Sequence, residues 1–270
     1  MANVLLEEMY RINYVATAEA IISFIRETVN SSNASGVVLG LSGGVDSSAV
    51  AVLSVKALGP DRVLGIIMPT DFTPRQDLEH AEMLARNLGI ETRYIPITSI
   101  VEEYARQLNV PLSHVDAKIP YANLRARVRM SILYFHANLL NRLVAGTGDR
   151  SEILLGYYTK YGDAGVDFLP IGNIYKTQLR HLCKHLGLPD EIAFKPSSPQ
   201  LYPGHRAVDE LPADYTILDP ILHALFDQNL SIDQVVAQNF ERKIVEEVWR
   251  RYVASMHKRA MPPIGPKPIR

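Results

Sequence analysis

The chain has 270 residues, and its 28 basic and 29 acidic side chains leave a formal charge of −1. Such a balance provides no overall positive field that would attract nucleic acid. The apolar fraction of 47% and the charged fraction of 21% are typical of a soluble globular protein. No apolar run approaches the roughly 20 residues that a membrane-spanning helix needs. We therefore expect neither nucleic acid nor a membrane as a partner.

The cysteine content and the start of the chain bear on the compartment. Cys183 is the only cysteine, so an internal disulfide is excluded and a reducing compartment is favoured. The first residues carry no basic stretch followed by an apolar core, which is the pattern of a secretion signal. We therefore expect a cytoplasmic protein.

In the first part of the chain, helical patterns alternate with short apolar strands. The predicted elements are a helix over residues 3–29, a strand over 37–39, a helix over 46–58, a strand over 63–68, a helix over 74–88, a strand over 92–97, a helix over 99–108, a helix over 121–141 and a strand over 143–145. This alternation predicts an α/β fold with a doubly wound, mostly parallel sheet and helices on both faces. Ligands of such sheets bind at the carboxyl ends of the strands.

The second part of the chain is less regular. Helices are predicted over residues 177–186 and 231–255, whereas residues 195–215 are rich in Pro, Gly and charge and are expected to form a mobile loop. The tail from Pro262 contains too many prolines for regular structure. Because there is no internal repeat and no convincing domain boundary, we interpret residues 1–270 as a single domain.

The most informative stretch is a glycine turn after the first strand, and a helical pattern begins at its end. Its residues are Gly40, Leu41, Ser42, Gly43, Gly44, Val45, Asp46 and Ser47. A glycine turn between a strand and a helix leaves backbone N–H groups pointing at one place, where the helix dipole also favours an anion. We predict that this turn binds phosphate. It lacks the Lys-Ser or Lys-Thr of a Walker A loop and does not fit Gly-x-Gly-x-x-Gly.

The acid in this turn indicates a metal ion. Asp46 would repel a phosphate unless a divalent cation bridges the two, and magnesium prefers such oxygen ligands. The alternative is that Asp46 or Ser47 only caps the helix while the glycines make a tight turn. The complete pattern, Ser-Gly-Gly-x-Asp-Ser after an apolar strand, favours the phosphate site. It resembles the pyrophosphate-binding loop of the ATP pyrophosphatases, which cleave ATP between its α and β phosphates and include NAD, GMP, asparagine and argininosuccinate synthetases.

A second glycine turn, Ala145 to Glu152, follows the last predicted strand. Alone it would be interpreted as a hairpin or a helix cap, but a parallel sheet would bring both turns to one edge. Glu152 would then share a magnesium ion with Asp46, and Thr147 would hydrogen-bond a nucleotide. Two acids that converge on a triphosphate require such an ion to offset their repulsion.

Further motifs narrow the resemblance from a group to one family. Gly-Thr-Gly-x-x-Ser-Glu at 146–152, Gly-Tyr-x-Thr-Lys-Tyr-Gly-Asp-x-Gly-Val-Asp at 156–167 and Lys-Thr-Gln-Leu-Arg at 176–180 occur in the order and spacing of the ammonia-dependent NAD synthetases. The resemblance is strong from Val37 to Leu186 and extends weakly to Lys258. It implies the adenine nucleotide alpha hydrolase-like form of the doubly wound fold.

The resemblance also implies a reaction. Such enzymes adenylate the nicotinate carboxylate of deamido-NAD with ATP, release pyrophosphate, and let ammonia displace AMP to give NAD, the last step of NAD biosynthesis. By motif match, the first glycine turn would hold the ATP phosphates, with Asp46 and Glu152 on magnesium. Thr147 and Lys176 would contact ATP, and Lys176 would neutralise charge that builds on the phosphates. Asp163 would orient ammonia or accept its proton.

The same match implies a dinucleotide site and a second subunit. Enzymes of this family are homodimers with the dinucleotide near the interface, so a homodimer is expected. His257 and Lys258 match a pair that closes over the dinucleotide. The residues expected to bind deamido-NAD are Arg127, Lys160, Asp167, Asn123, Tyr134, His257 and Lys258.

Some positions depart from the family's usual pattern. Ser198 takes the position of a hydroxyl that contacts ATP, but Pro199 and Gln200 differ from the usual residues and change the local backbone. Asp149 stands where Asn is commoner, which we interpret as a mild change.

Other functions share parts of these patterns. A GMP synthetase-like amidating core would keep the phosphate loop, but residues 156–167 do not support it; a tRNA thiolase usually needs more cysteines and a more basic chain. A non-catalytic adenine-nucleotide sensor would not need Asp46, Glu152 and Lys176 together. Since Cys183 lies in mid-helix, we do not expect a glutaminase nucleophile. Free ammonia is therefore the expected nitrogen source, unless a separate subunit supplies it.

Overall fold

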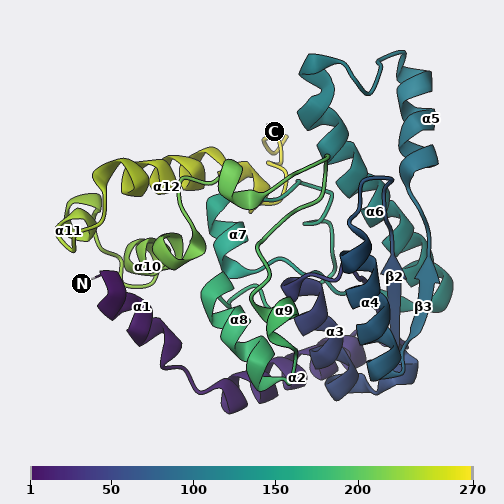
Figure 1. Cartoon of the computed structure of the whole chain (residues 1–270), viewed down its shortest axis with the longest axis horizontal. Coiled ribbons are helices and arrows are strands. Elements are labelled where there is room, and N and C mark those ends of the chain that lie inside the picture. Colours follow the sequence, from purple (N-terminus) through teal and green to yellow (C-terminus); the bar gives the residue numbers. More distant parts are fainter. Residues whose placement is uncertain (1, 269–270) are drawn as a thin grey trace.

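The computed structural model describes residues 2–268 (Figure 1). Within them, four parallel strands form one sheet in the order β3-β2-β1-β4. The strands are β1 (Gly36–Gly40), β2 (Val63–Ile67), β3 (Glu91–Tyr94) and β4 (Arg142–Val144). Val37 of β1 lies opposite Val63 on one side and Leu143 on the other. All of β2 and most of β1 are buried, as expected for parallel strands that are covered on both faces.

Helices cover both faces of the sheet, which confirms the predicted doubly wound α/β fold. The helices that enclose a core on one face are α2 (Tyr14–Ser31), α3 (Val45–Leu58), α4 (Arg75–Leu88) and α8 (Lys176–His185). On the other face, a second core lies beneath α5 (Thr98–Leu108) and α6 (Lys118–Leu140). The carboxyl ends of the parallel strands therefore open at one edge between these layers.

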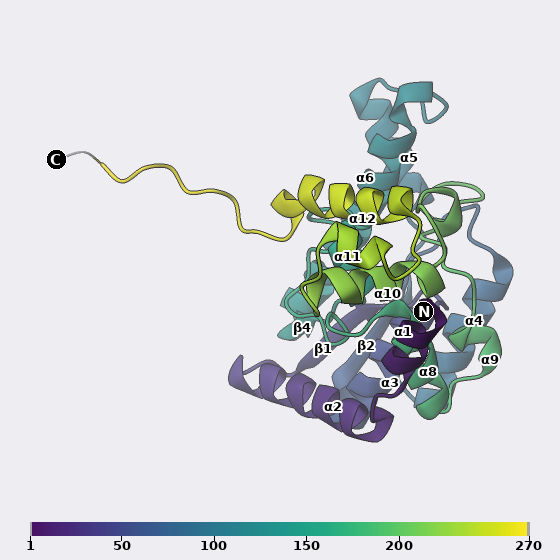
Figure 2. The same cartoon turned by 90° about the vertical axis from the view of Figure 1, so that its left-hand side faces the viewer.

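A third core packs the first helix of the chain against helices from its C-terminal part, and these helices lie on one side of the molecule (Figure 2). Leu5 and Met9 of the first helix pack there with Leu154 and Leu155, which follow the end of β4. The helices that contribute to it are α1 (Ala2–Tyr10), α7 (Arg150–Leu155), α10 (Tyr215–Phe226), α11 (Ile232–Val236) and α12 (Arg242–Ala254). The short α9 (Asp190–Ala193) follows α8. Helix α7 thus connects the sheet to the C-terminal helices.

Two of the predicted helices are divided in the structure. The helix predicted over 3–29 is α1 and α2, and Asn13 separates them because its side chain accepts a hydrogen bond from Ala16 N at 3.0 Å and caps α2. The helix predicted over 231–255 is α11 and α12, and Asn239 between them has a φ of 67°, which a right-handed helix does not allow. Helix α10 is absent from the sequence prediction.

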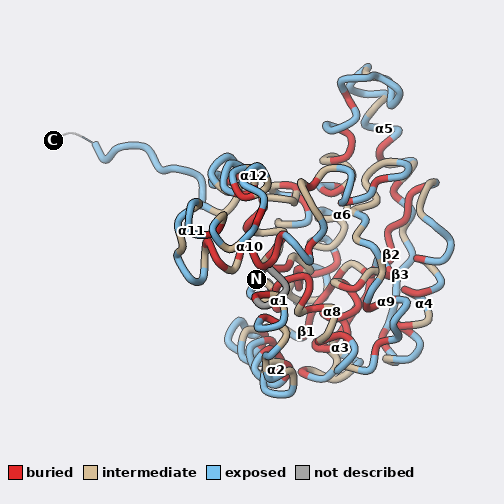
Figure 3. The backbone as a smooth tube through the Cα atoms, turned by 60° about the vertical axis from the view of Figure 1, so that its left-hand side comes forward, coloured by how far each residue is buried: buried red, intermediate tan, exposed pale blue. Residues whose placement is uncertain are grey.

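Helix α5 and the first turns of α6 project from the body of the molecule, and much of this projection is exposed (Figure 3). Residues 261–268 extend away from the body without regular structure (Figure 2). Within residues 2–268, none of the helices combines the length and the apolar character that crossing a membrane requires.

Candidate active site

The first glycine turn joins β1 to α3, as predicted. Gly43 has a φ of +74°, and a Cβ at this position would lie 2.1 Å from the carbonyl oxygen of Asp77 in α4, so only glycine fits. The hydroxyls of Ser42 and Ser47 are 3.0 Å apart, and the N–H of Gly44 donates to the Ser42 hydroxyl at 3.3 Å. The turn is therefore held in shape by its own hydroxyls and by close packing on α4.

A cavity of about 260 Å³ opens at the carboxyl ends of β1, β2 and β4. Both glycine turns line it, so the parallel sheet does bring them to one edge. The residues of the predicted ATP, metal and catalytic sites that line it are Gly40, Leu41, Ser42, Asp46, Ser47, Thr147, Glu152, Asp163 and Ser198. Four other predicted residues do not line it, namely Gly43, Gly44, Val45 and Lys176.

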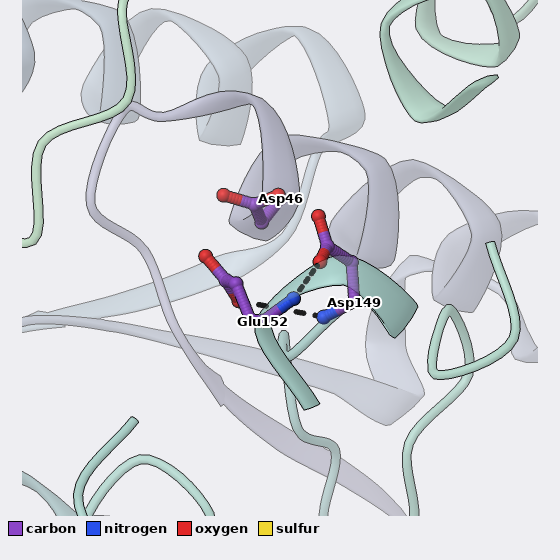
Figure 4. A group of neighbouring side chains, drawn as sticks. All are labelled: Asp46, Asp149 and Glu152. Atoms are coloured by element: carbon purple, nitrogen blue, oxygen red, sulfur yellow. Dashed lines mark hydrogen bonds between the residues drawn. The ribbon is translucent and has the colours of Figure 1, made fainter. Parts of the chain in front are cut away.

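Three carboxylates meet beside this cavity (Figure 4). Asp46 projects from the first turn of α3, Asp149 and Glu152 project from the start of α7, and ligand oxygens of all three lie within 4.8 Å of one another. Asp149 and Glu152 also form a capping box: Asp149 Oδ1 accepts from the Glu152 N–H at 2.9 Å, and Glu152 Oε2 accepts from the Asp149 N–H at 3.4 Å. The sequence prediction left Asp149 out of the site, although its spacing to Glu152 is the signature of such a box.

Lys176 is the cation among these acids. It is the first residue of α8, its side chain is fully buried, and its Nζ lies 2.5 Å from Asp46 Oδ1, 3.0 Å from Asp149 Oδ2 and 3.1 Å from Glu152 Oε1. Burial alone would lower the pKa of Lys176, but attraction to the three carboxylates outweighs it and raises this pKa well above its ordinary value. The lysine therefore stays charged.

The acids outnumber the lysine, and they differ in exposure. Burial raises the pKa of Asp149 and of Glu152, and the charge of Lys176 only partly offsets this. The Asp149 side chain has no exposed surface, whereas the side chains of Asp46 and Glu152 are 25% and 22% exposed. A divalent cation fits these donors, because two partly exposed carboxylates line the cavity and magnesium prefers oxygen ligands.

Comparison with known proteins identifies the family. The sequence profile of the family described as NAD synthase matches residues 17–262. The chain belongs to this family. The NH3-dependent NAD+ synthetase of Hyperthermus butylicus is 49% identical over 260 residues, which cover 96% of this chain and 93% of that protein. The enzyme of the same name from Staphylothermus marinus is 45% identical over 265 residues, with 97% and 95% covered.

Solved structures of NAD synthase family proteins and their relatives agree with this assignment. The NH3-dependent NAD synthetase from Campylobacter jejuni has a TM-score of 0.78 and 33% identity, covering 94% of this chain and 100% of that one. The NMN synthetase from Francisella tularensis has a TM-score of 0.82 and 29% identity, with 94% and 99% covered. The comparisons confirm the predicted family, fold and NH3-dependent NAD+ synthetase activity.

In this NAD synthase family member, the residues predicted to bind deamido-NAD lie together around the loop 156–167 but outside the wall of the 260 Å³ cavity. Lys160 Nζ donates to the His257 carbonyl at 2.6 Å, and Arg127 Nη2 donates to the Lys160 carbonyl at 3.4 Å. The Tyr134 hydroxyl donates to Asp167 Oδ1 at 3.0 Å. These contacts join α6, the loop and the C-terminal segment into one polar surface.

The same loop is anchored at further predicted positions. Lys258 Nζ donates to two backbone carbonyls of the loop, both at 2.7 Å, and Asn123 Oδ1 accepts from the Thr159 hydroxyl at 2.7 Å. Asp163 accepts from the Thr159 N–H at 2.9 Å, and burial raises the pKa of Asp163 above its ordinary value. Asp163 therefore both shapes the loop and reaches the cavity.

The segment after Lys195 forms another wall of the cavity. Lys195 and Gln200 both donate side-chain hydrogen bonds to the buried carboxylate of Asp77 in α4. The Ser198 hydroxyl, which lines the cavity, donates to a backbone carbonyl within the segment. Gln200 has a φ of 50°. The departure from the family pattern at Gln200 therefore has a structural use, because its amide ties this wall to the helix that supports the first glycine turn.

Proposed function

We propose that the chain makes NAD from deamido-NAD in two steps at the 260 Å³ cavity. In the first step the nicotinate carboxylate attacks the α-phosphorus of ATP, and pyrophosphate leaves. In the second step ammonia attacks the carbonyl carbon of the resulting adenylate, and AMP leaves. The observation that carries the proposal is the convergence of the first glycine turn, three carboxylates and Lys176 at one strand edge, in a chain whose relatives are NH3-dependent NAD+ synthetases.

The first glycine turn is proposed to hold the ATP phosphates. The start of α3 carries the positive end of the helix dipole, and the hydroxyls of Ser42 and Ser47 stand in the cavity wall beside it. Because Gly43 packs directly on α4, the backbone keeps a fixed shape for the phosphates. Thr147 and Ser198 would add hydroxyl contacts from the second turn and from the segment after Lys195.

Asp46 and Glu152 are proposed to hold magnesium, because theirs are the carboxylates that line the cavity. The bound ion would supply positive charge to the phosphates and to the departing pyrophosphate. Asp149 is fully buried and remains the counter-ion of Lys176. Lys176 in turn adds a fixed positive charge close to the place where negative charge builds up on the phosphates.

The loop 156–167 is proposed to receive deamido-NAD. Lys160 lies in this loop, and Arg127 and Lys258 bond to its backbone, so three cations that suit the diphosphate of a dinucleotide gather here. Asp163 reaches from this loop into the cavity, where its carboxylate would orient ammonia or take its proton. The raised pKa of Asp163 supports this role, since it makes the carboxylate a stronger base.

A direct assay tests the function. Purified protein would be mixed with Mg·ATP and deamido-NAD, with and without ammonium, and NAD, AMP and pyrophosphate would be followed. We expect continued turnover, with equal amounts of all three products, only in the presence of ammonium. Deamido-NMN is the matched second acceptor because of the likeness to the Francisella tularensis NMN synthetase. The Hyperthermus butylicus and Staphylothermus marinus relatives, at 49% and 45% identity, favour the dinucleotide.

Two results would contradict the proposal. Pyrophosphate release that ignores both deamido-NAD and deamido-NMN but responds to another carboxylate or carbonyl acceptor would favour a GMP synthetase-like core. Tight binding of ATP without turnover would favour a nucleotide sensor.

The buried single cysteine supports a reducing, cytoplasmic setting as part of the proposal.

A homodimer is also proposed. Phe135 and Leu139 lie one turn apart on α6 and are 64% and 65% exposed, and a groove between α5 and α6 lies beside Phe135. Exposed apolar residues that adjoin in this way mark interaction surfaces. We expect light scattering to give the mass of a dimer for the natural chain and of a monomer for Leu139→Asp. Val15→Asp on α2, at a residue 57% exposed, is the control and should leave the dimer intact.

A further inference from the structure

Helix α10 brings to the cavity a phenol that the proposed reaction does not use. Tyr215 is the first residue of α10, it is only 3% exposed, and it lines the cavity. Among the described residues, its buried hydroxyl has no hydrogen-bond partner. Buried polar groups are almost always paired, and leaving one unpaired destabilises the fold. An unpaired hydroxyl on a residue that lines an active-site cavity therefore points to a partner that binds there.

The charges around Tyr215 determine what that partner is. Its ring centroid lies 5.6 Å from Lys176 Nζ. Burial, and then repulsion from Glu152, Asp149 and Asp46, raise the pKa of Tyr215 well above its ordinary value, although Lys176 acts in the opposite sense. The phenol therefore stays protonated and can donate a hydrogen bond. The partner must be an acceptor that tolerates the neighbouring carboxylates.

A carboxylate one turn further along α10 holds this phenol in place. Asp219 is fully buried and accepts hydrogen bonds from the Ser151 hydroxyl at 2.6 Å and from the Thr177 N–H at 2.8 Å. The Ser151 hydroxyl also accepts from the Lys176 N–H at 2.9 Å. Because residues four apart share a helix face, the contacts that tie α10 to the starts of α7 and α8 also direct Tyr215 toward the acids and Lys176.

We propose that Tyr215 contacts the substrate: its hydroxyl donates a hydrogen bond to a phosphate oxygen of ATP, or of the pyrophosphate formed from it, bound beside Asp46 and Glu152. The inference rests on the ATP site proposed above. A phosphate oxygen is the acceptor that fits, because the divalent cation that binds with it offsets the repulsion between the phosphate and the carboxylates. A neutral donor suits this position, since a further lysine would compete with that cation for the carboxylates.

The variant Tyr215→Phe removes the unpaired hydroxyl and nothing else. Without ligand, its melting temperature should equal or exceed that of the natural chain, because no hydrogen bond is lost on substitution. Calorimetric titration with Mg·ATP, and separately with Mg·pyrophosphate, should show an affinity weakened by about tenfold or more, as is typical when a hydrogen bond to a charged group is removed.

Tyr121→Phe is the matched control. Tyr121 is 4% exposed, does not line the cavity, and donates its hydroxyl hydrogen bond to the Val110 carbonyl. This variant should melt at a lower temperature than the natural chain and keep its affinity for Mg·ATP. The two substitutions are chemically identical, so opposite effects on stability and on ligand affinity separate a ligand contact from a structural one.

The pattern of affinities completes the test. Weakening of both ligands locates the contact on the part of the phosphate chain that ATP and pyrophosphate share, and weakening of ATP alone locates it nearer the α-phosphate; both support the proposal. Unchanged affinity for both ligands overturns it, whatever the melting temperature. If the natural chain itself does not bind Mg·ATP, the proposed ATP site is refuted and this inference with it, which is a different result from a change confined to the variant.

Discussion

The loops at the sheet edge and helix α10 serve the same cavity in different ways. The two glycine turns contribute partly exposed groups, such as the carboxylates of Asp46 and Glu152, that line the cavity. Helix α10 contributes the buried groups Tyr215 and Asp219, of which Asp219 bonds to the starts of α7 and α8. The sheet edge therefore supplies most of the charge, whereas a distant part of the chain holds that charge in position.

Replacing Lys176 with Met should have the largest effect on stability and activity, because it acts on the charged groups at the sheet edge. Asp149 would stay buried without a counter-charge, which typically costs roughly 3–5 kcal/mol of unfolding free energy. The rate constant kcat should fall by about 10²–10³-fold because a fixed charge near the phosphates is lost. Magnesium should raise the melting temperature of the variant more than that of the natural chain, since the ion can replace the missing cation among three acids.

Lys184→Met is the control on the same helix. Lys184 Nζ pairs with Asp190 Oδ1 at 3.2 Å, with the two side chains 49% and 69% exposed, so its loss should change stability by less than about 0.5 kcal/mol. Chemical denaturation, steady-state rates and melting curves with and without magnesium check these expectations. A Lys176→Met variant that does not respond to magnesium would contradict the proposed metal site.

The variant Asp219→Asn tests whether the buried carboxylate on α10 positions the charged groups of the cavity. The amide keeps the size of the carboxylate but replaces one acceptor with a donor, which then faces either the Ser151 hydroxyl or the Thr177 N–H. We expect a loss of about 1–3 kcal/mol in unfolding free energy and a higher KM for ATP, with a smaller effect on kcat. Asp214→Asn is the control, because Asp214 caps α10 and Asn caps helices equally well. Lower stability with an unchanged KM would show that Asp219 supports packing alone.

Asp219 also predicts a pH dependence. Burial raises the pKa of Asp219 to about 7, and hydrogen bonds from Ser151 and Thr177 only partly oppose this. The unfolded chain releases the same proton near pH ~4, so the folded state holds more protons between these two values. The stability contributed by Asp219 is therefore fully present below about pH 4 and is lost as the pH rises through about 7.

The difference in unfolding free energy between the natural chain and Asp219→Asn isolates this term. We expect chemical denaturation from about pH 5 to 8 to show this difference. The natural chain should lose unfolding free energy relative to Asp219→Asn as the pH rises to about 7, and the difference should then stay constant. A difference that grows in favour of the natural chain over the same range would contradict the assigned cause.

The sequence predicted the sheet-edge side well because its signals are local. The strand predicted over 37–39 lies within β1, and the helix predicted over 46–58 begins one position inside α3. Helix α10 was not predicted, since Pro220 lies inside it and a run rich in Pro, Gly and charge precedes it. The N-cap residue Asp214 was the available signal. The spacing between Asp149 and Glu152 was enough to predict their capping box. The contact between Asp149 and Lys176 could not be predicted, because it depends on how α7 and α8 pack.

Substitution of Cys183 should have the smallest effect on activity and stability, and it tests whether this part of α8 serves only the core. It lies on α8 like Lys176, but its Sγ faces the α3 side of the sheet core and donates weakly to the Val45 carbonyl at 3.8 Å. Burial raises the pKa of this thiol well above its usual range, so little thiolate forms. We expect Cys183→Ala to keep kcat within about twofold and to lose about 1 kcal/mol of unfolding free energy. A thiol reagent should label the natural chain only after unfolding. Rapid labelling of the folded chain with loss of activity would contradict this expectation. It would mean that the part of α8 that carries Cys183 is accessible from the cavity and does not only support the core.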